Sequence, residues 1–355
     1  MNQQPIQIAV IGCGRIANIA HLPALSALPN AKIKYVCDLI EEKATAAKNT
    51  FSVPYAITDY KTALADAEVD AVYVLTPNAA HYTITMDALA AGKHVFCEKP
   101  VAVNYALSKE MADAASRAKK LLHIGVCNRY NCAVEQLAQR NAAKEFGKLY
   151  HVYCSFRSFR SIPGLGGAFT DRSQSGGGVL IDWGIHFLDL ILYVLGGAKL
   201  QSVTCDTYSE MAKDMREYRY LSMWAEDTKN LNGTNDVEDF VTGYIRTDRA
   251  SISFNGAWAQ NIGTEEMFVD FLGDKGGARL RYGSDYTLYT TENGILTEKK
   301  PLIKINNHYE AEDAAFLEAI RTNAHTKNEI TEILESMKLL DGLYTSAKQH
   351  REIVF

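Results

Sequence analysis

The sequence predicts an α/β protein in two parts: a doubly wound parallel sheet, then an α+β region built on an open, mainly antiparallel sheet. The first third of the 355 residues alternates between short apolar segments and longer amphipathic ones, as parallel strands and their covering helices do. Later segments are strand-like and separated by turn residues, which indicates antiparallel strands. The length favours two domains, which we place at residues 1–126 and 127–355.

The first region is expected to contain five strands and four helices. Its strand segments are short and continuously apolar, which is typical of strands buried on both faces. The predicted strands are residues 7–11, 33–37, 71–75, 94–97 and 121–126. The predicted helices are residues 16–28, 41–51, 82–91 and 105–119.

The second region opens with a helix and a strand and then follows a different pattern. A glycine-rich loop and an apolar helix come next, and strand-like segments with turns such as residues 247–249 continue to about residue 304. This pattern predicts an antiparallel meander. The remaining predictions are helices at residues 133–144, 309–321 and 329–348, and strands at residues 149–156 and 352–355.

The first strand runs into GCGRIA, residues 12–17, which has the form GxGxxA. Gly12 permits a tight turn, Gly14 lets the backbone approach a pyrophosphate, and the following helix offers its N-terminus to the phosphates. The context predicts a Rossmann dinucleotide site that includes Gly12, Gly14, Arg15 and Ile16. An ordinary strand-to-helix turn is the alternative.

Asp38 ends the second predicted strand at about the spacing expected of the acid that binds the adenosine ribose. A carboxylate there would repel a 2′-phosphate, so it favours NAD over NADP. Arg15 is close in sequence and could relax this preference, which keeps NADP possible. A solvated aspartate with no ligand is the alternative.

Two further strand ends carry polar residues: Thr76 and Asn78 follow one strand, and Glu98 and Lys99 follow the next. Ligands of doubly wound sheets bind at the carboxyl ends of the strands, so these residues are expected to line the same crevice. Asn78 could instead cap a helix, and Glu98 and Lys99 could form a surface ion pair.

The apolar run GGGVLIDWGIHFLDLILYVLGG, residues 176–197, carries ionisable side chains. At 100° per residue, Asp182, His186, Asp189 and Tyr193 fall within about 60° of one another on a helix. Buried charges need partners or a wet cleft. From this segment alone, an internal hydrogen-bond network and a functional site both remain open.

Together these motifs resemble the glucose–fructose oxidoreductase, inositol dehydrogenase and rhizopine-catabolism family, Gfo/Idh/MocA. The resemblance rests on GCGRIA, Asp38, TPNAAH, AGKHVFCEKP and GGGVLIDWGIHFLDL, and it spans nearly the whole chain. It implies an NAD(P)-dependent oxidoreductase that acts on sugars or cyclic polyols and forms a homodimer or homotetramer through the open sheet.

The resemblance also implies roles for single residues. Lys99 would contact the reacting hydroxyl and the nicotinamide ribose, and a cis bond often precedes the position of Pro100. Asp182 and His186 would lie opposite the nicotinamide, with His186 as the acid/base. Asp189 and Tyr193 lie deeper along the same helix, so we expect them to be structural support. The remaining matches are Asn78 and His81 near the cofactor and Arg129, in VCNRYN, in the substrate pocket.

Other charged residues give weaker signals. Arg157 flanks the glycine-rich loop and could bind a sugar if that loop closes over it; an exposed charge is the alternative. Three acids lie within residues 235–240, and the lack of tight ligand spacing favours a solvated sheet edge over a metal site. We predict no bound metal.

We expect an NAD-dependent enzyme that moves a hydride between the nicotinamide and a ring secondary alcohol of a sugar, glycoside or polyol, with sugar C3 as one candidate position. An NAD-dependent glycosidase is one alternative, and a non-catalytic nucleotide or sugar sensor is another. The presence of both Lys99 and His186 favours an enzyme over a sensor.

Composition narrows the expected partners and location. The net charge of −5 and the absence of a basic run argue against nucleic acid. Seven cysteines without a CxxC pair indicate reduced thiols in a cytoplasmic protein. No membrane partner is expected, because residues 179–195, the segment nearest to a membrane span, contain three ionisable residues.

Overall fold

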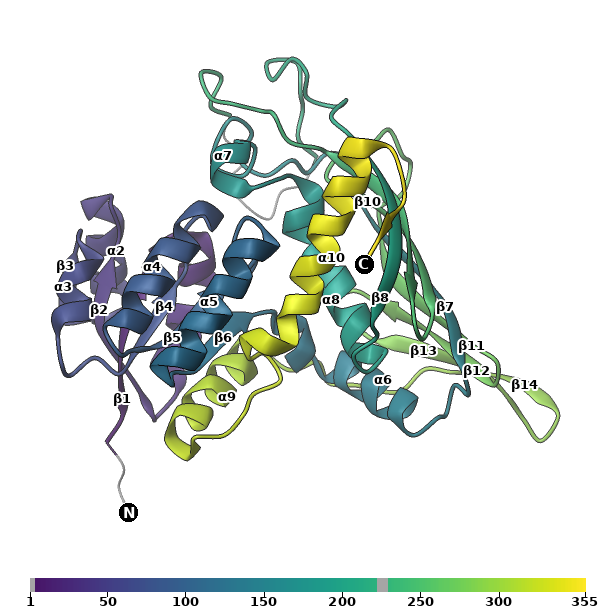
Figure 1. Ribbon diagram of the computed structural model, residues 1–355, viewed down its shortest axis with the longest axis horizontal. Helices are drawn as coiled ribbons and strands as arrows, with labels where there is room; N and C mark the ends of the chain where they lie inside the picture. Colours follow the sequence, from purple (N-terminus) through teal and green to yellow (C-terminus); the bar gives the residue numbers. More distant parts are fainter. Residues whose placement is uncertain (1–3, 222–228) are drawn as a thin grey trace. The chain divides into compact units, whose positions relative to one another are not determined.

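The structure is a computed structural model that describes residues 4–221 and 229–355. The chain divides into two compact units (Figure 1). Unit 1 consists of Met1–Cys127 and Asn307–Leu334, and unit 2 consists of Asn128–Asn306 and Glu335–Phe355. The first segment of unit 1 ends within one residue of the predicted boundary.

Residues 307–334 belong to unit 1, whereas the prediction assigns them to the second domain. Phe316 and Leu317 are fully buried in the same apolar core as Ile8 and Tyr73 of the first sheet. Burial of these side chains is the physical reason that the segment joins unit 1.

Unit 1 is built on a six-stranded parallel sheet in the order β3-β2-β1-β4-β5-β6. The order reverses between β1 and β4, as in doubly wound dinucleotide-binding sheets. The strands are β1 (Ile6–Ile11), β2 (Ala31–Cys37), β3 (Tyr55–Ile57), β4 (Ala71–Val74), β5 (His94–Glu98) and β6 (Leu122–Gly125). The predicted doubly wound parallel sheet is confirmed, although its strand β3 is too short to give a signal in the sequence.

The helices of unit 1 cover this sheet, and several begin at side-chain caps. Asp59 caps α3 and Asn104 caps α5, because each side chain accepts a backbone N–H of the first turn. The helices are the π-helical turn η1 (Ala17–His21), α1 (Leu22–Ala27), α2 (Glu41–Phe51), α3 (Tyr60–Ala65), α4 (Asn78–Ala90), α5 (Tyr105–Ala118), α9 (His308–Thr322) and the first residues of α10 (Ile330–Gln349).

Unit 2 is built on a nine-stranded sheet in the order β14-β13-β12-β11-β7-β10-β9-β8-β15. Only the β7–β10 pair is parallel; the other neighbours are antiparallel. The predicted open, mainly antiparallel sheet is confirmed, but β7 interrupts the predicted meander. The strands are β7 (Leu149–Arg157), β8 (Leu200–Tyr208), β9 (Phe240–Thr247), β10 (Ser251–Ala257), β11 (Glu266–Gly273), β12 (Gly276–Arg281), β13 (Tyr286–Glu292), β14 (Ile295–Lys299) and β15 (Ile353–Val354).

A buried helix covers one face of this second sheet. Phe187 of that helix stacks on Phe156 of β7, with ring centroids 4.8 Å apart. Because side chains alternate along a strand, Arg157 points to the opposite, open face. The helical segments of unit 2 are the 3₁₀ turn η2 (Cys127–Tyr130), α6 (Cys132–Ala142), α7 (Arg172–Ser175), the π-helical turn η3 (Leu180–Gly184), α8 (Ile185–Val194) and the rest of α10.

Two properties of the core bear on the sequence predictions. The helical run 172–194 has the length and apolar composition of a membrane span, but 83% of its apolar window is buried inside the protein, as in a core helix. All seven cysteines are free thiols; six are buried and Cys132 is partly exposed.

Candidate functional site

The glycine turn after β1 has the geometry that a dinucleotide needs. Gly12 has φ = 98°, where glycine is favoured, and a Cβ at this position would clash with the Leu75 carbonyl. A Cβ at Gly14 would meet no described atom within 4 Å, so the space in front of it is open to a ligand. Arg15 is exposed and Ile16 is partly exposed beside this space.

Asp38 is fixed against the glycine turn. Its Oδ2 accepts the Cys13 N–H at 2.9 Å, and its Oδ1 accepts the Ile40 N–H at 2.9 Å. A carboxylate oxygen can accept a second hydrogen bond. Asp38 can therefore bind ribose hydroxyls while it holds the turn in place.

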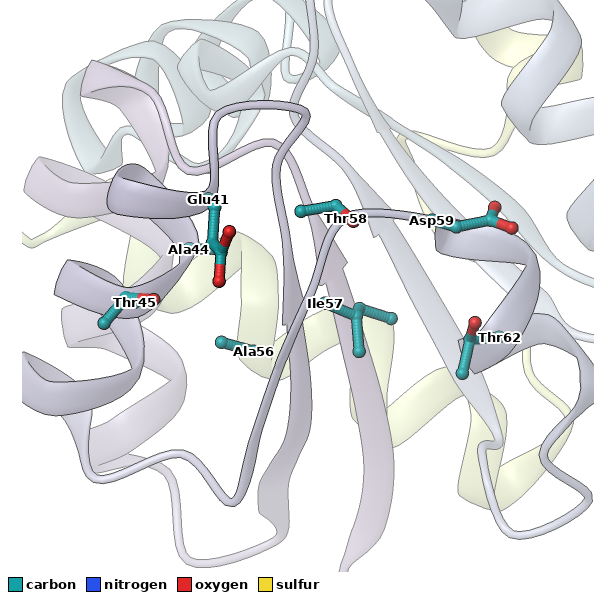
Figure 2. Close-up of a pocket in the computed structure, with 8 residues that line it drawn as sticks. All are labelled: Glu41, Ala44, Thr45, Ala56, Ile57, Thr58, Asp59 and Thr62. Carbon is teal, nitrogen blue, oxygen red and sulfur yellow. The ribbon is translucent and has the colours of Figure 1, made fainter.

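A hollow of about 340 Å³ lies beside this end of β2 (Figure 2). It adjoins the aspartate because the Asp38 N–H donates to the Ile57 carbonyl at 3.2 Å. Its lining includes the carboxylates of Glu41 and Asp59 and contains no lysine or arginine. Such a surface does not favour an added phosphate. The lining residues are Glu41, Ala44, Thr45, Ala56, Ile57, Thr58, Asp59 and Thr62.

The end of β4 offers an unused polar atom and a buried histidine. The Thr76 hydroxyl is buried and makes no hydrogen bond within the described chain. His81 is fully buried, with Nδ1 2.8 Å from the Pro100 carbonyl oxygen and Nε2 2.9 Å from that of Thr76. Burial lowers the pKa of His81. His81 thus ties two strand ends together, and both of its ring nitrogens face backbone carbonyls.

Asn78 is the first residue of α4 and does not cap it. Pro77 occupies the cap position and makes no side-chain cap hydrogen bond, so the alternative interpretation of Asn78 as a helix cap is wrong. The N-terminus of α4 lies at the carboxyl ends of the strands, which form the ligand edge of the sheet.

Glu98 is buried and does not form the surface ion pair considered for it. Its Oε1 lies 3.0 Å from His21 Nε2, and its Oε2 accepts the backbone N–H of Lys99 at 2.9 Å. The Lys99–Pro100 bond is cis, as the resemblance implies. Lys99 itself is partly exposed. Glu98 is therefore a support for Lys99, whereas the prediction placed it in contact with the cofactor.

Taken together, this edge of unit 1 fits NAD. Gly14 leaves room for the pyrophosphate, Asp38 offers ribose acceptors, and the Thr76 hydroxyl is buried without a partner. Each of these features matches what a dinucleotide requires at the carboxyl ends of parallel strands.

In unit 2, the histidine of the polar stripe has a defined neighbour. His186 Nδ1 lies 3.3 Å from Asn128 Nδ2, which also donates to the Tyr282 hydroxyl at 3.1 Å. An amide nitrogen only donates, so in this arrangement His186 Nδ1 is the acceptor. A 180° turn of the Asn128 amide would support the other tautomer. Neither Asn128 nor Tyr282 was predicted.

Asp182 lies on the π-helical turn η3 and is buried, with Oδ2 accepting the indole N–H of Trp258 at 3.2 Å. The regular α-helical spacing assumed in the sequence prediction is therefore wrong at this turn. Single π turns occur often at functional sites. Trp258 is fully buried, and its indole orients this carboxylate.

Arg129 and Asp189 form a buried ion pair. The guanidinium Nε and Nη2 each lie 2.8 Å from an oxygen of Asp189, and Arg129 is 4% exposed. Ser336 donates to the same carboxylate at 2.7 Å, and the Arg129 guanidinium lies 5.3 Å from the Tyr193 ring centroid. The structural role expected of Asp189 is confirmed. The burial of Arg129 argues against the substrate contact predicted for it.

Arg157 lies on the open face of the second sheet, where it pairs with Glu266 and Ser155. The helix that carries His186 covers the other face of the sheet, on which Phe156 stacks with Phe187. This position argues against the substrate contact predicted for Arg157, because alternation along β7 turns its side chain away from the covered face.

Two of the three acids within residues 235–240 are buried, so the prediction of a solvated sheet edge is wrong for these two. Glu238 is 2% exposed; its Oε1 accepts the N–H groups of Gly178 and Leu180, at 2.8 and 3.2 Å, and the Tyr344 hydroxyl at 2.7 Å. It therefore caps the helix that carries Asp182 and His186. Asp239 is also buried. Across the described residues, no cluster of three or more histidine, cysteine or acidic side chains is arranged to hold a metal.

Comparison with known proteins agrees with this geometry. Residues 6–126 match the family model described as "Oxidoreductase family, NAD-binding Rossmann fold", and residues 134–279 match "GFO/IDH/MocA C-terminal domain". D-glucoside 3-dehydrogenase of Escherichia coli is 29% identical over 98% of this chain and 97% of its own. Myo-inositol 2-dehydrogenase of Thermotoga maritima is 28% identical over 84% and 87%.

Solved structures show the same fold. Levoglucosan dehydrogenase in complex with NADH and levoglucosan superposes with a TM-score of 0.85 over 99% of both chains, at 20% identity. Identity this low shows the fold alone. The two family models together cover most of the chain, and the open glycine turn with Asp38 beside it fits their NAD-binding description. The chain therefore belongs to the Gfo/Idh/MocA family and is an NAD-binding oxidoreductase.

Proposed function

We propose that this enzyme moves a hydride between NAD and a ring carbon that bears a secondary hydroxyl, in a sugar, a glycoside or a cyclic polyol. The relatives named above are dehydrogenases of a glucoside, an inositol and an anhydrosugar. The proposal rests mainly on one observation. His186 pairs with Asn128, and His186 lies on the same helical run as Asp182.

Each step of alcohol oxidation has a residue suited to it. The hydroxyl proton needs a base, and an imidazole has the right unperturbed pKa. His186 serves this role, with the Asn128 amide able to support it as acceptor or donor. A cation stabilises the developing alkoxide, and Lys99 supplies it. NAD, when bound, accepts the hydride.

Asp182 is suited to hold a substrate hydroxyl. Its Oδ2 is engaged by Trp258, which fixes the orientation of the carboxylate, and a carboxylate has further acceptor positions. A hydrogen bond from a ring hydroxyl to Asp182 would orient the neighbouring carbon for transfer. This geometry supports Asp182 as a binding residue and His186 as the acid/base.

We further propose that NAD is preferred over NADP, that the enzyme is a homodimer or homotetramer, and that it works in the cytoplasm. Asp38 and the carboxylate-lined hollow beside it support the NAD preference. The seven free thiols support a reducing compartment. Sugar C3 is the proposed position of transfer, on the example of the glucoside 3-dehydrogenase.

The test is a panel of inositols, aldoses, glycosides and keto-sugars with NAD and NADP, followed by absorbance at 340 nm. The variants His186→Ala and Lys99→Ala should each lose about 100-fold or more in kcat while NAD binding persists. His325→Ala and Lys109→Ala, at exposed sites, serve as matched controls. Glycoside hydrolysis without net NADH would contradict the proposal and favour a glycosidase; a silent panel would favour a sensor.

A further inference from the structure

The unit 1 core contains a histidine held between two carboxylates. His21 is fully buried, with Nδ1 3.0 Å from Asp313 Oδ1 and Nε2 3.0 Å from Glu98 Oε1. Asp313 is also fully buried, and Glu98 is 6% exposed. These three residues, His21, Asp313 and Glu98, form what we call the buried triad. They come from η1, α9 and β5, three elements far apart in sequence.

The geometry favours a charged imidazole in this triad. Two carboxylate oxygens face the two ring nitrogens, so both nitrogens donate when His21 is protonated. Burial alone would lower the pKa of His21, but its interactions with Asp313 and then Glu98 raise it to about 10. The ring lies edge-on to Phe96, at 4.9 Å between centroids, which excludes water from this side.

Stability alone is a weak reason for such an arrangement. Charges removed from water carry a desolvation penalty, and apolar residues of similar volume are often as stable or more stable than a buried ion pair. The triad instead has a geometric consequence. One Glu98 oxygen is taken by His21, and the other accepts the Lys99 N–H at 2.9 Å.

Close packing against β6 also restricts the position of the Glu98 side chain. Gly125 of β6 is the residue paired with Glu98 in the sheet. A Cβ at Gly125 would lie 3.0 Å from the Glu98 carboxyl carbon and from Oε1, closer than ordinary contact distances. The carboxylate is therefore held from two sides, by His21 and by the backbone of β6.

We propose that His21 and Asp313 are positioning residues for Lys99: they fix the Glu98 carboxylate, which in turn holds the Lys99 backbone beside the cofactor edge of the sheet. This inference rests on the role of Lys99 in the proposed function. A main chain displaced by about 1 Å can cost two orders of magnitude in rate. Through the triad, η1 and α9 help to fix the position of the Lys99 ammonium.

The principal test replaces His21→Asn, since an asparagine cannot span both carboxylates. We expect kcat to fall about 10-fold or more while the Kd for NAD changes less than about threefold. Glu312→Gln is the matched control, because Glu312 is the next residue on α9, equally buried, and bonded to Asn328 at 2.6 Å instead of the triad. A similar fall in the control would overturn the proposal.

A double-variant cycle separates positioning from a general structural effect. In a Lys99→Met background, His21→Asn should cause little further loss of kcat, because the group it positions is already gone. Independent, multiplicative losses would overturn the proposal. If His21→Asn does not fold, Gly125→Ala displaces the same carboxylate without removing a charge, and the same cycle applies.

A readout independent of turnover keeps the two proposals distinguishable. In ¹⁵N-lysine-labelled protein, the Lys99 amide should exchange with solvent about 10-fold faster or more in His21→Asn than in the wild type or in Glu312→Gln. Unchanged exchange would overturn the positioning role. A wild type inactive on the whole substrate panel would defeat the proposed function, and Lys99 exchange would still decide the role of the triad.

Discussion

Asp38 combines a structural and a binding role in one side chain. Its two oxygens accept the backbone N–H groups of Cys13 and Ile40, so the carboxylate is oriented before any ligand arrives. Preorganised acceptors lose little further freedom on binding. The same negative charge that suits a ribose diol opposes a 2′-phosphate.

We expect Asp38→Ala to weaken NAD binding about 10-fold or more, the loss typical of hydrogen bonds to a charged group, and to weaken NADP binding less. The ratio of the two Kd values, measured by fluorescence titration, is the decisive quantity because both cofactors lose the turn support equally. Asp38→Asn keeps one oxygen that can accept the Cys13 N–H, so its ratio of Kd values should lie between those of the wild type and Asp38→Ala. Equal weakening of both cofactors would contradict the assignment.

Asp239 is a buried carboxyl whose titration affects stability. Burial raises the pKa of Asp239 from 3.8 to about 6, while its Oδ2 accepts the Met211 N–H at 2.7 Å. The folded pKa is above the unfolded one, so the folded state binds the proton more tightly. Stability from this group is complete below about pH 4 and is lost as the pH rises through about 6.

We expect Asp239→Asn to remove this loss. Relative to the wild type, the variant should gain about 3 kcal/mol in unfolding free energy between pH 4 and pH 7, at about 1.4 kcal/mol per pKa unit. Urea unfolding at four pH values measures the difference. Glu217→Gln, at an exposed carboxyl, is the control and should show a flat difference; a flat difference in Asp239→Asn as well would contradict the prediction.

Residues within motifs could be predicted, and their supports could not. Gly12 and Asp38 follow from the strand-turn-helix context, because the local chain determines their geometry. Asn128 and Trp258 gave no such signal, since their partners His186 and Asp182 are 58 and 76 residues away. Only the fold brings such pairs together.

At the scale of elements, the helix that carries Asp182 and His186 depends on a cap from a distant part of the chain. Glu238, two residues before the start of β9, accepts the N–H groups of Gly178 and Leu180. A carboxylate at a helix N-terminus also interacts favourably with the helix dipole. The start of this functional helix is therefore fixed by the sheet on which it packs.

We expect Glu238→Gln to destabilise the protein by about 1–3 kcal/mol, the cost of removing a buried charged acceptor, and to lower kcat several-fold as the helix start shifts. Thermal unfolding and steady-state kinetics measure the two effects. Asp236→Asn alters a neighbouring acid that is exposed and is the control. Wild-type stability in Glu238→Gln would show that the cap is dispensable.

Element predictions succeeded where the periodicity was long and failed where it was short or altered. α4, α5, α9 and α10 lie close to their predicted ranges. The π-helical turn η3 is as apolar as the α-helix that follows it. The sequence pattern therefore does not reveal the extra residue in this turn. The parallel pairing of β7 with β10 depends on contacts that no local pattern records.

At the scale of the molecule, the chain returns to its first unit after building most of the second. Residues 307–334 supply Asp313 to the buried triad and Phe316 to the first core. Their apolar periodicity predicts a helix correctly, but a helix that needs apolar partners does not specify which core provides them. Assignment of this segment to a unit therefore required the structure.

The open face of the second sheet carries exposed apolar side chains. Leu272, Tyr244 and Tyr289 are 37%, 36% and 45% exposed there, and Leu272 and Tyr289 lie in one row across the sheet through Gly277. Exposed apolar side chains on a broad sheet mark a protein contact. A second copy of the chain is the expected partner, because symmetric pairing of one face is the commonest assembly.

We therefore expect the protein to be a dimer or tetramer in solution, and Leu272→Glu to shift it toward the monomer, because a charge placed in a desolvated contact without a partner is costly. Light scattering after size exclusion, over a range of concentrations, measures the mass. Leu302→Glu changes a fully exposed leucine outside the sheet and should leave the mass unchanged. A monomeric wild type, or an oligomer that tolerates Leu272→Glu, would show that this face serves another purpose.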